Sequence, residues 1–383
     1  MKAILATILA LIVFEPLGAQ PKEQAKKGPP PEWNLYVGTY TRPQKSKGIY
    51  AWRFQPATGK LTPIGLVAET ASPSFLAVHP NQHVLYAVNE LREGAISAFA
   101  IDPPTGKLTF LNKVSAKGDG PCHISVDRSG RWVYAANYGS GSVAAFPVHE
   151  DGSLGDSSAF VQHTGSSVNP GRQKGPHAHS VVIAPDNRFV FAADLGLDQV
   201  FGYRIDTNRG GMATDEPTVT KVAPGSGPRH VAFRPDGRFL YVLNEMLSTV
   251  VAFRYDAHKG TTEELQTLST LPADFKGNNS GAEIAAHRSG NYLYTSNRGH
   301  DTIAMFRVDL TSGKLTSLGH ASTRGKTPRS FGIDPTGTWL FAANQDSDNM
   351  AMFRIDLKTG NLNPVGDMIE AFAPVCVVFA AIK

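Results

Sequence analysis

Six ionisable side chains stand at corresponding places in repeated segments of this 383-residue sequence. They are His179, Arg229, Glu245, Glu283, Arg298 and Arg329. Guanidinium groups bind oxyanions, and an imidazole transfers protons near neutral pH. A cavity that collected these side chains would bind an acidic molecule and move a proton on it. The competing interpretation is a water-filled channel that merely prefers polar residues, in which the same charges form structural ion pairs.

The repeat alignment arranges these residues in columns. The place that follows an opening proline holds Ser74, Cys122, His179, Arg229, Ala282, Arg329 and Val375. The next place holds Phe75, His123, Ser180, His230, Glu283, Ser330 and Cys376. A second apolar run ends in each repeat at a pair such as Asn244-Glu245 or Asn297-Arg298. Because the two runs are antiparallel, both sets of residues should lie on one face of the ring and meet in a central funnel.

The elements that must position these side chains repeat seven times. GPCHISVDRSGRWVYAANYGSGSVAAFPV (120–148) and GPRHVAFRPDGRFLYVLNEMLSTVVAFRYD (227–256) each contain an alternating apolar run, a turn and a second run, as in an antiparallel hairpin with a third strand. The second runs end at Thr39, Asn89, Asn137, Asp194, Asn244, Asn297 and Asn344, 47 to 57 residues apart. Units of this size are typical of propeller blades. The terminal Asn and Asp residues fit a structural role in which they bond the local backbone.

The order of the strands indicates how the ring closes. The first unit begins with a second strand, Asn34–Thr39, and the chain ends with an opening strand, APVCVVFA (373–380). Pairing of these two segments would complete one blade and remove two exposed sheet edges. We therefore predict an all-β protein, a seven-bladed β-propeller closed by pairing of the N- and C-terminal strands. The propeller domain should span residues 33–383.

Composition sets further limits. The chain is 41% hydrophobic and 18% charged, which is ordinary for a globular domain. A formal net charge of +4 without a basic cluster argues against nucleic acid as a partner. At the N-terminus, Lys2, an apolar run over 3–14 and Leu17-Gly18-Ala19 predict a signal peptide over 1–19, followed by a flexible leader over 20–32. The apolar run is too short to span a bilayer, so we expect an exported, periplasmic or secreted monomer without a membrane span.

One long loop interrupts the regular spacing. The segment TGSSVNPGRQKGPHAHS (164–180) contains Arg172 and ends in His177 and His179, two residues apart. Two histidines of that spacing on a strand would share a face and supply half of a metal site, but no second ligand cluster accompanies them. The composition better suits a loop folded over the mouth of the funnel. Cys122 and Cys376 fall on strands two blades apart, and without a CxxC pattern they predict neither a disulfide nor a zinc site. No metal or other cofactor is expected.

Several segments resemble one known family. GPRHVAFRPDGRFLYVLNE, VNPGRQKGPHAHS, SGAEIAAHRSGNYLYTSNR and LYVGTYT are similar to the lactonase family of seven-bladed propellers, which includes bacterial 6-phosphogluconolactonase and fungal carboxymuconate cyclase. The similarity runs from about Trp33 to the C-terminus. It implies a catalytic set of His, Arg, Glu and Arg in the central cleft. The matching positions are His177 or His179, Arg229, Glu245 and Arg298.

The resemblance implies hydrolysis of a sugar-type lactone that carries an anionic group. Such a reaction needs an activated water and positive charge beside the developing oxyanion, which Arg229 and Arg298 would supply. Glu245, between two arginines, should stay ionised and be a weak base, so a histidine is the better proton carrier. We expect Arg172, His230, Glu283 and Arg329 to bind substrate. A cycloisomerase of the carboxymuconate type and a non-catalytic propeller that binds a partner on its rim remain the alternatives.

Overall fold

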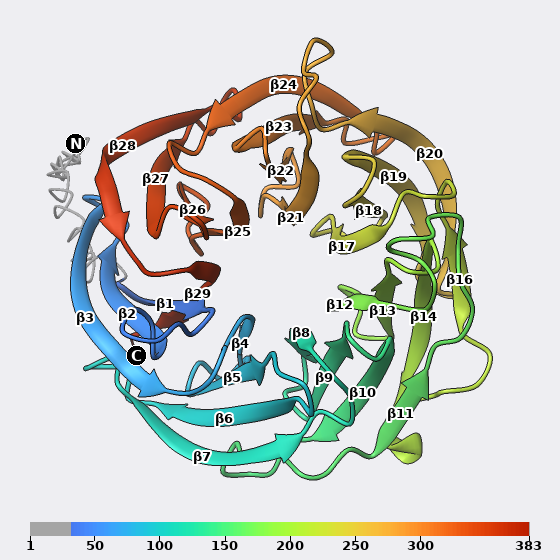
Figure 1. Cartoon of the computed structure of the whole chain (residues 1–383), viewed down its shortest axis with the longest axis horizontal. Helices are drawn as coiled ribbons and strands as arrows, with labels where there is room; N and C mark the ends of the chain where they lie inside the picture. The colour runs from blue at the N-terminus through green and yellow to red at the C-terminus, as the bar shows by residue number, and fades with distance from the viewer. Residues whose placement is uncertain (1–31, 383) are drawn as a thin grey trace, which may run out of the picture. The chain divides into compact units, whose positions relative to one another are not determined.

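The computed structural model describes residues 32–382, which form seven antiparallel sheets arranged as blades around an axis (Figure 1). The innermost strands are β29 (Pro374–Ala381), β4 (Leu76–Val78), β8 (Pro121–Val126), β12 (Ala178–Ile183), β17 (Pro228–Phe233), β21 (Ser280–Ala286) and β25 (Pro328–Ile333). The second strands are β1 (Trp33–Thr39), β5 (Val84–Asn89), β9 (Trp132–Asn137), β13 (Phe189–Asp194), β18 (Phe239–Asn244), β22 (Tyr292–Arg298) and β26 (Trp339–Asn344).

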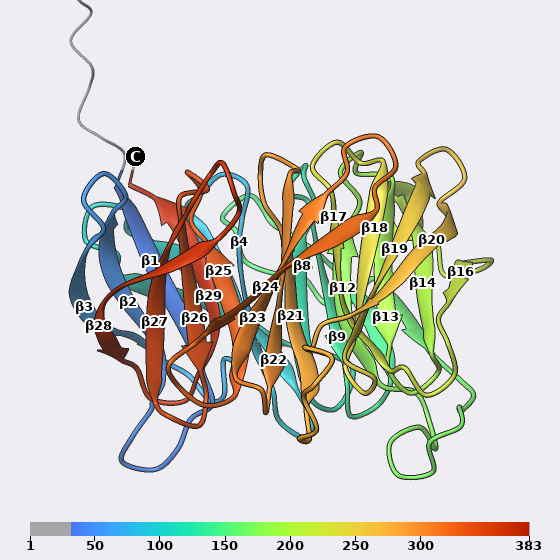
Figure 2. The same cartoon turned by 90° about the horizontal axis from the view of Figure 1, so that it is seen from above.

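The two outer layers complete each blade. The third strands are β2 (Gly48–Gln55), β6 (Ala95–Ile101), β10 (Ser142–Pro147), β14 (Gln199–Asp206), β19 (Thr249–Asp256), β23 (Thr302–Val308) and β27 (Asn349–Ile355). The outermost strands are β3 (Lys60–Glu69), β7 (Leu108–Ser115), β11 (Ala159–Gln162), β16 (Thr218–Lys221), β20 (Thr261–Ser269), β24 (Leu315–Ser322) and β28 (Leu362–Glu370). A short strand, β15 (Gly211–Met212), also pairs with β14, after a 3-10 turn at Thr207–Arg209. Figure 2 shows the ring edge on, with the strands running between its two faces.

This architecture confirms the predicted seven-bladed propeller and its closure. β1 pairs antiparallel with β29 from Trp33↔Ala381 to Thr39↔Pro374, so the first and last strands of the chain belong to one sheet. The second strands end at the predicted residue in six blades, and β22 continues one residue further, to Arg298. The predicted signal peptide over 1–19 lies outside the described residues, as does the predicted leader apart from its last residue. No helix within residues 32–382 is long and apolar enough to cross a membrane.

The hydrophobic core lies between the blades rather than at the axis. Each of seven clusters of buried side chains joins two neighbouring sheets, because the alternating residues of each strand face the blade on either side. Tyrosines on second strands extend this packing to the adjacent blade. The hydroxyl of Tyr86 donates to the carbonyl of Gly152 at 2.9 Å, and Tyr294 reaches Gly360 at 2.8 Å in the same way. Each such buried hydrogen bond contributes about 1 kcal/mol to stability.

A β-bulge near the start of the innermost strand is the feature that positions the central side chains. In β17, Pro228 pairs with Asn244 and His230 with Leu243, which leaves Arg229 as an extra residue. The residues in or at the corresponding bulges of five other blades are Cys122, His179, Ala282, Arg329 and Val375. A bulged residue leaves the regular alternation of the strand, so its side chain takes a direction that the pleat alone would not give. These are residues of the column that follows the opening proline.

The amides that end the second strands hold the loops around the same face. The side chain of Asn137 donates to the carbonyl of Ala116 at 2.9 Å, and that of Asn344 donates to the carbonyl of Thr323 at 3.0 Å. Both residues are fully buried. These contacts agree with the structural role expected for the column.

Candidate active site

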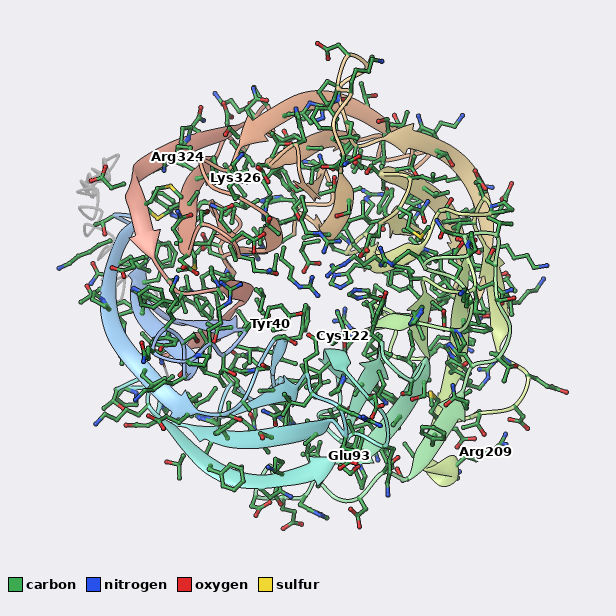
Figure 3. The ribbon with its side chains drawn as sticks, in the orientation of Figure 1. Tyr40, Glu93, Cys122, Arg209, Arg324 and Lys326 are labelled. Atoms are coloured by element: carbon green, nitrogen blue, oxygen red, sulfur yellow. The ribbon has the colours of Figure 1, made fainter. Side chains whose placement is uncertain are left out.

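A cavity of about 360 Å³ lies among the inner strands. Its walls are formed by Glu90, Cys122, Tyr138, Arg172, His179, Glu245, Ser280, Arg298 and Arg329. Figure 3 shows Cys122 and the neighbouring Tyr40 near the axis of the ring, while Arg209 lies on its outer edge. Several blades therefore supply polar side chains to one enclosure, as the columns predicted.

Glu245 is the centre of the charged network. It follows the last residue of β18, and its backbone N–H donates to the carbonyl of Gly227 at 2.7 Å, which fixes the position of the side chain. One carboxylate oxygen, Oε1, accepts from Arg172 Nη2 at 2.8 Å. The other, Oε2, lies 2.8 Å from Arg298 Nη2 and accepts from Arg229 Nε at 3.1 Å. Three guanidinium groups thus share one carboxylate that is 5% exposed.

The charges around Glu245 keep it ionised. Burial acts to raise the pKa of this carboxyl group, but the three neighbouring guanidinium groups outweigh burial and hold the pKa at about 2. A carboxylate with so low a pKa, and with both oxygens occupied, is a poor acceptor of a further proton. Glu245 is therefore well suited to orienting the arginines.

Arg229 lies beneath the cavity wall. Its side chain is almost completely buried, and besides Glu245 it contacts the carbonyl of Ala282 and the Nε2 atom of His230, the latter at 3.1 Å. Because a guanidinium can only donate, Nε2 of His230 accepts this bond and the ring proton is on Nδ1. That proton is donated to Glu283 Oε1 at 2.8 Å.

His230 and Glu283 are consequently placed behind Arg229, and neither lines the cavity. Glu283 also accepts bonds from the backbone of Ile284 and from the hydroxyl of Ser330. Burial raises the pKa of Glu283 and lowers that of His230. In this structure both residues support Arg229, whereas the sequence pattern had suggested that they contact substrate directly.

The two histidines of the PHAH segment have different environments. His177 precedes β12, stacks on the ring of Tyr138 at 4.6 Å between centroids, and directs Nδ1 to the carbonyl of that residue at 2.9 Å. His179 is the bulged residue of β12 and lines the cavity. The condition for a shared strand face is not met, because His177 precedes the strand, which begins at Ala178, and the bulge at His179 breaks its alternation.

His179 is the lining side chain with a nitrogen available for proton transfer. Its Nε2 lies 3.9 Å from Glu245 Oε2, beyond hydrogen-bond distance, and its Nδ1 lies 3.6 Å from the sulfur of Cys122. Burial and then the positive charge of Arg229 hold the pKa of His179 well below 6.5. The imidazole is therefore neutral at physiological pH. Both cysteines are buried free thiols, and burial raises the pKa of Cys122.

The long loop brings Arg172 to this network. Gln173, which is fully buried, donates to the carbonyl of Leu195 at 2.8 Å and accepts from the backbone of Asn169 at 3.0 Å. These bonds anchor the loop and leave the neighbouring Arg172 to reach Glu245 and the hydroxyl of Tyr138, at 3.1 Å from the latter. The side chain of Arg172 is 44% exposed. The loop thus forms part of the cavity wall.

Four lining residues were not among the predicted site residues: Glu90, Cys122, Tyr138 and Ser280. Glu90 and Tyr138 directly follow the asparagines that end β5 and β9, the same place that Glu245 occupies after β18. Cys122 stands in the column of His179 and Arg229. The positional signal was therefore present, but the types of these side chains did not single them out.

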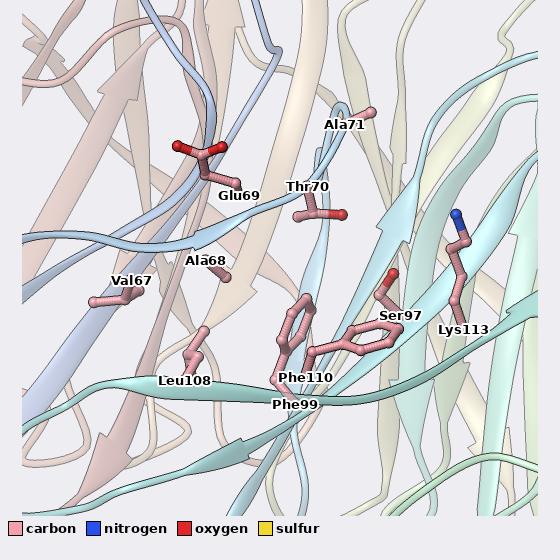
Figure 4. A pocket seen from close by; sticks show the side chains of 10 residues that line it. All are labelled: Val67, Ala68, Glu69, Thr70, Ala71, Ser97, Phe99, Leu108, Phe110 and Lys113. Carbon is pink, nitrogen blue, oxygen red and sulfur yellow. The ribbon is translucent and has the colours of Figure 1, made fainter.

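A groove of about 480 Å³ on the outside of the ring is less suited to chemistry. It lies between the outer strands β3 and β7, with apolar residues such as Phe99, Phe110 and Leu108 on its walls (Figure 4). Its ionisable groups are Glu69 and Lys113. Within the described part of the chain, no group of three or more His, Cys, Asp or Glu side chains is arranged to hold a metal ion.

Comparisons with known proteins agree with this geometry. The family described as "Lactonase, 7-bladed beta-propeller" matches residues 34–379. The 6-phosphogluconolactonase of Bacillus subtilis is 38% identical over 302 residues, which cover 79% of this chain and 85% of that protein. The 6-phosphogluconolactonase of Klebsiella pneumoniae is 32% identical over 295 residues, 77% of this chain and 84% of that protein.

Solved structures show the same relationship. A periplasmic gluconolactonase of Pseudomonas aeruginosa superposes with a TM-score of 0.86 at 36% identity, over 92% of this chain and 100% of that chain. The match to the family extends over nearly all of the described residues and includes every strand that contributes to the cavity. The chain therefore belongs to the lactonase family of seven-bladed β-propellers.

Proposed function

We propose that this chain is a lactonase that hydrolyses the ester bond of a sugar-type lactone, in the manner of 6-phosphogluconolactonase. The observation that carries the proposal is the enclosure of Glu245 by three guanidinium groups beside a neutral, buried His179. Membership of the family and the names of its relatives support the same reaction.

In the proposed mechanism, His179 is the general base. A water between its Nε2 and the lactone carbonyl carbon loses a proton to the imidazole as its oxygen bonds to that carbon. The negative charge that develops on the carbonyl oxygen is stabilised by Arg298, whose position is fixed by Glu245. Collapse of the tetrahedral intermediate breaks the ester C–O bond, and the imidazolium returns the proton to the leaving alkoxide. The product is the open-chain hydroxy acid.

Activity and its pH dependence test the proposal. The purified protein is expected to hydrolyse glucono-δ-lactone or its 6-phosphate above the spontaneous rate, and to do so equally in EDTA. Because His179 acts as the neutral base and its pKa is lowered, kcat/KM should stay constant as the pH falls through 6.5 and decline only at lower pH.

Two variants separate the candidate bases. His179→Ala should remove most of the activity, and Glu245→Gln should cause a partial loss if that residue only orients the arginines. A decline of kcat/KM that begins above pH 6.5, or full activity of His179→Ala, would contradict the assigned role of His179. Loss of activity in EDTA with recovery on added metal would instead indicate a metal-dependent reaction at the histidines.

We further propose that the chain is exported and acts as a monomer on a small anionic lactone. The N-terminal pattern of a signal peptide supports export, and the Pseudomonas aeruginosa relative is named a periplasmic enzyme. Expression in a bacterial host followed by fractionation should place a protein that begins near Gln20 in the periplasm, and size-exclusion chromatography should give the mass of one chain. A full-length product that remains in the cytoplasm would contradict export.

A further inference from the structure

Arg329 differs from the other arginines of the cavity wall. Arg172 and Arg298 both bind Glu245, whereas no hydrogen bond or ion pair joins the side chain of Arg329 to another residue in the described range 32–382. Arg329 is the bulged residue of β25, and its guanidinium carbon lies 5.2 Å from the centre of the Tyr40 ring. One guanidinium group of the wall therefore stacks on an aromatic face and forms no direct ion pair within residues 32–382, although the carboxylates of Glu90 and Glu245 act on its charge.

The support behind Arg329 is itself fixed by hydrogen bonds. Tyr40, directly after β1, donates its hydroxyl to Glu90 Oε2 at 2.8 Å, and Ser74 donates to the same oxygen. The backbone N–H of Tyr40 donates to the carbonyl of Ala373 at 3.1 Å. Stacking on the ring face leaves the N–H groups on the edge of a guanidinium plane free to donate. The arrangement is preorganised for a ligand.

A charged side chain without an ion-pair partner raises the free energy of an enclosed site unless a bound ligand supplies the missing hydrogen bonds. Taking a guanidinium out of bulk water loses hydration, and an oxyanion that accepts two of its N–H bonds restores the lost interactions. Burial acts to lower the pKa of Arg329, but Tyr40 and Glu90 raise it, so the group stays charged. An anionic ligand would complete the hydrogen bonds of this charged group.

Arg329 enters the cavity from a different part of the ring than the residues assigned to the reaction. Tyr40 comes from the closing blade, and Glu90 and Arg329 come from the two blades that flank it. His179 and Glu245 come from blades across the ring (Figure 1). A ligand whose ester lies at His179 would extend its other end toward Arg329.

We propose that Arg329, stacked on Tyr40, binds an acidic group that the substrate carries at the end away from its ester, and so determines preference for anionic over neutral lactones. The inference rests on the proposed lactonase function. A carboxylate and a phosphate share the required chemistry, since both accept two parallel N–H bonds from arginine.

The test compares three lactones on one sugar ring: glucono-δ-lactone, its 6-phosphate, and the lactone with a carboxylate at that carbon. The native protein should prefer one or both of the charged lactones. Arg329→Gln should lower kcat/KM on the preferred charged lactone about ten- to a hundredfold, mainly through KM, and reduce its preference over the neutral one by a similar factor. The relative loss on phosphate and carboxylate identifies the acidic group.

Matched variants isolate the contributing groups. Tyr40→Phe keeps the ring and should retain the preference for the charged lactone, whereas Tyr40→Leu removes the ring and should weaken it. Arg324→Gln is the control for loss of an arginine, because Arg324 is an exposed residue that bonds the carbonyl of Gly366 at 3.1 Å. Its kinetics should match those of the native protein.

A binding measurement keeps the inference testable without turnover. Calorimetry with the open-chain 6-phosphate and 6-carboxylate acids should show that at least one of them binds Arg329→Gln at least tenfold more weakly than it binds the native protein. Equal losses on all three lactones, or unchanged binding of both acids, would overturn the role of Arg329 while leaving the lactonase proposal intact. If no lactone is hydrolysed but the acids still bind through Arg329, the proposed reaction fails and the anion subsite stands.

Discussion

The Arg298→Ala variant is expected to lose two to three orders of magnitude in kcat/KM on a lactone that the native protein hydrolyses. Arg298 lines the cavity and lies 2.8 Å from Glu245, so its guanidinium is positioned by a fixed carboxylate at the place where the oxyanion would form. Removal of one donor to an oxyanion typically lowers the rate by about a hundred- to a thousandfold. Steady-state kinetics of the purified variant measure the loss.

Two further arginine variants show whether this loss is chemical. Arg209→Ala removes an exposed ion pair with Asp215 on the outer edge and should be fully active. Arg229→Ala should be unlike both, because this residue is 2% exposed and its removal takes one buried guanidinium partner from Glu245 and the donor from Nε2 of His230. Breaking such a buried pair costs about 3–5 kcal/mol, so the melting temperature should fall clearly. An Arg298→Ala variant with native kcat/KM would show that the oxyanion is stabilised elsewhere.

Deletion of residues 374–383 is expected to prevent the ring from forming a stable native state. The deletion removes β29, which supplies the innermost strand of the closing blade, and exposes the unpaired edge of β1. It also removes Val377 and Cys376 from the core clusters on the two sides of that blade. Thermal unfolding followed by circular dichroism, compared with the full chain, should show a loss of cooperative melting or a large fall in melting temperature.

Adding the deleted strand back as a peptide distinguishes loss of ring closure from a general effect of truncation. A synthetic peptide of residues 374–383 added to the truncated chain should raise its melting temperature, because the peptide can add to the β1 edge as a strand. A peptide with the same composition in scrambled order should have no effect. A truncated chain that melts within a few degrees of the parent would contradict the requirement for β29.

The fold was predictable because its signal is repeated. Alternating apolar runs and turns of the PDG type recur at nearly constant spacing, so errors at single residues do not change the number of blades. The closing pair was predictable for a related reason: Asn34–Thr39 and 373–380 are each half of a hairpin without its partner. Burial of strand edges then requires them to pair.

The repeat alignment predicted which residues gather around the central cavity, but not how deeply each side chain is buried. Sequence position brought His179, Arg229, Glu245 and Arg298 to one region, but it did not show that Arg229 lies under the wall. It also did not separate His177 from His179. Both distinctions depend on the bulges, and the bulged residues His179 and Arg229 are not glycines, so the sequence carries none of the usual signs of a bulge.

The bulges have a consequence for how such a ring can change. A bulged residue leaves the regular ladder, so its side chain can be exchanged without altering the strand pairing of its blade. Ala282 and Val375 occupy two of these places with small apolar groups, while Cys122, His179, Arg229 and Arg329 occupy the others. Single substitutions at Cys122, His179 and Arg329, the three bulge positions that line the cavity, can therefore alter its substrate while the blades stay the same. The strand pairing of the blades and the side chains that contact the substrate can, in this sense, change independently of each other.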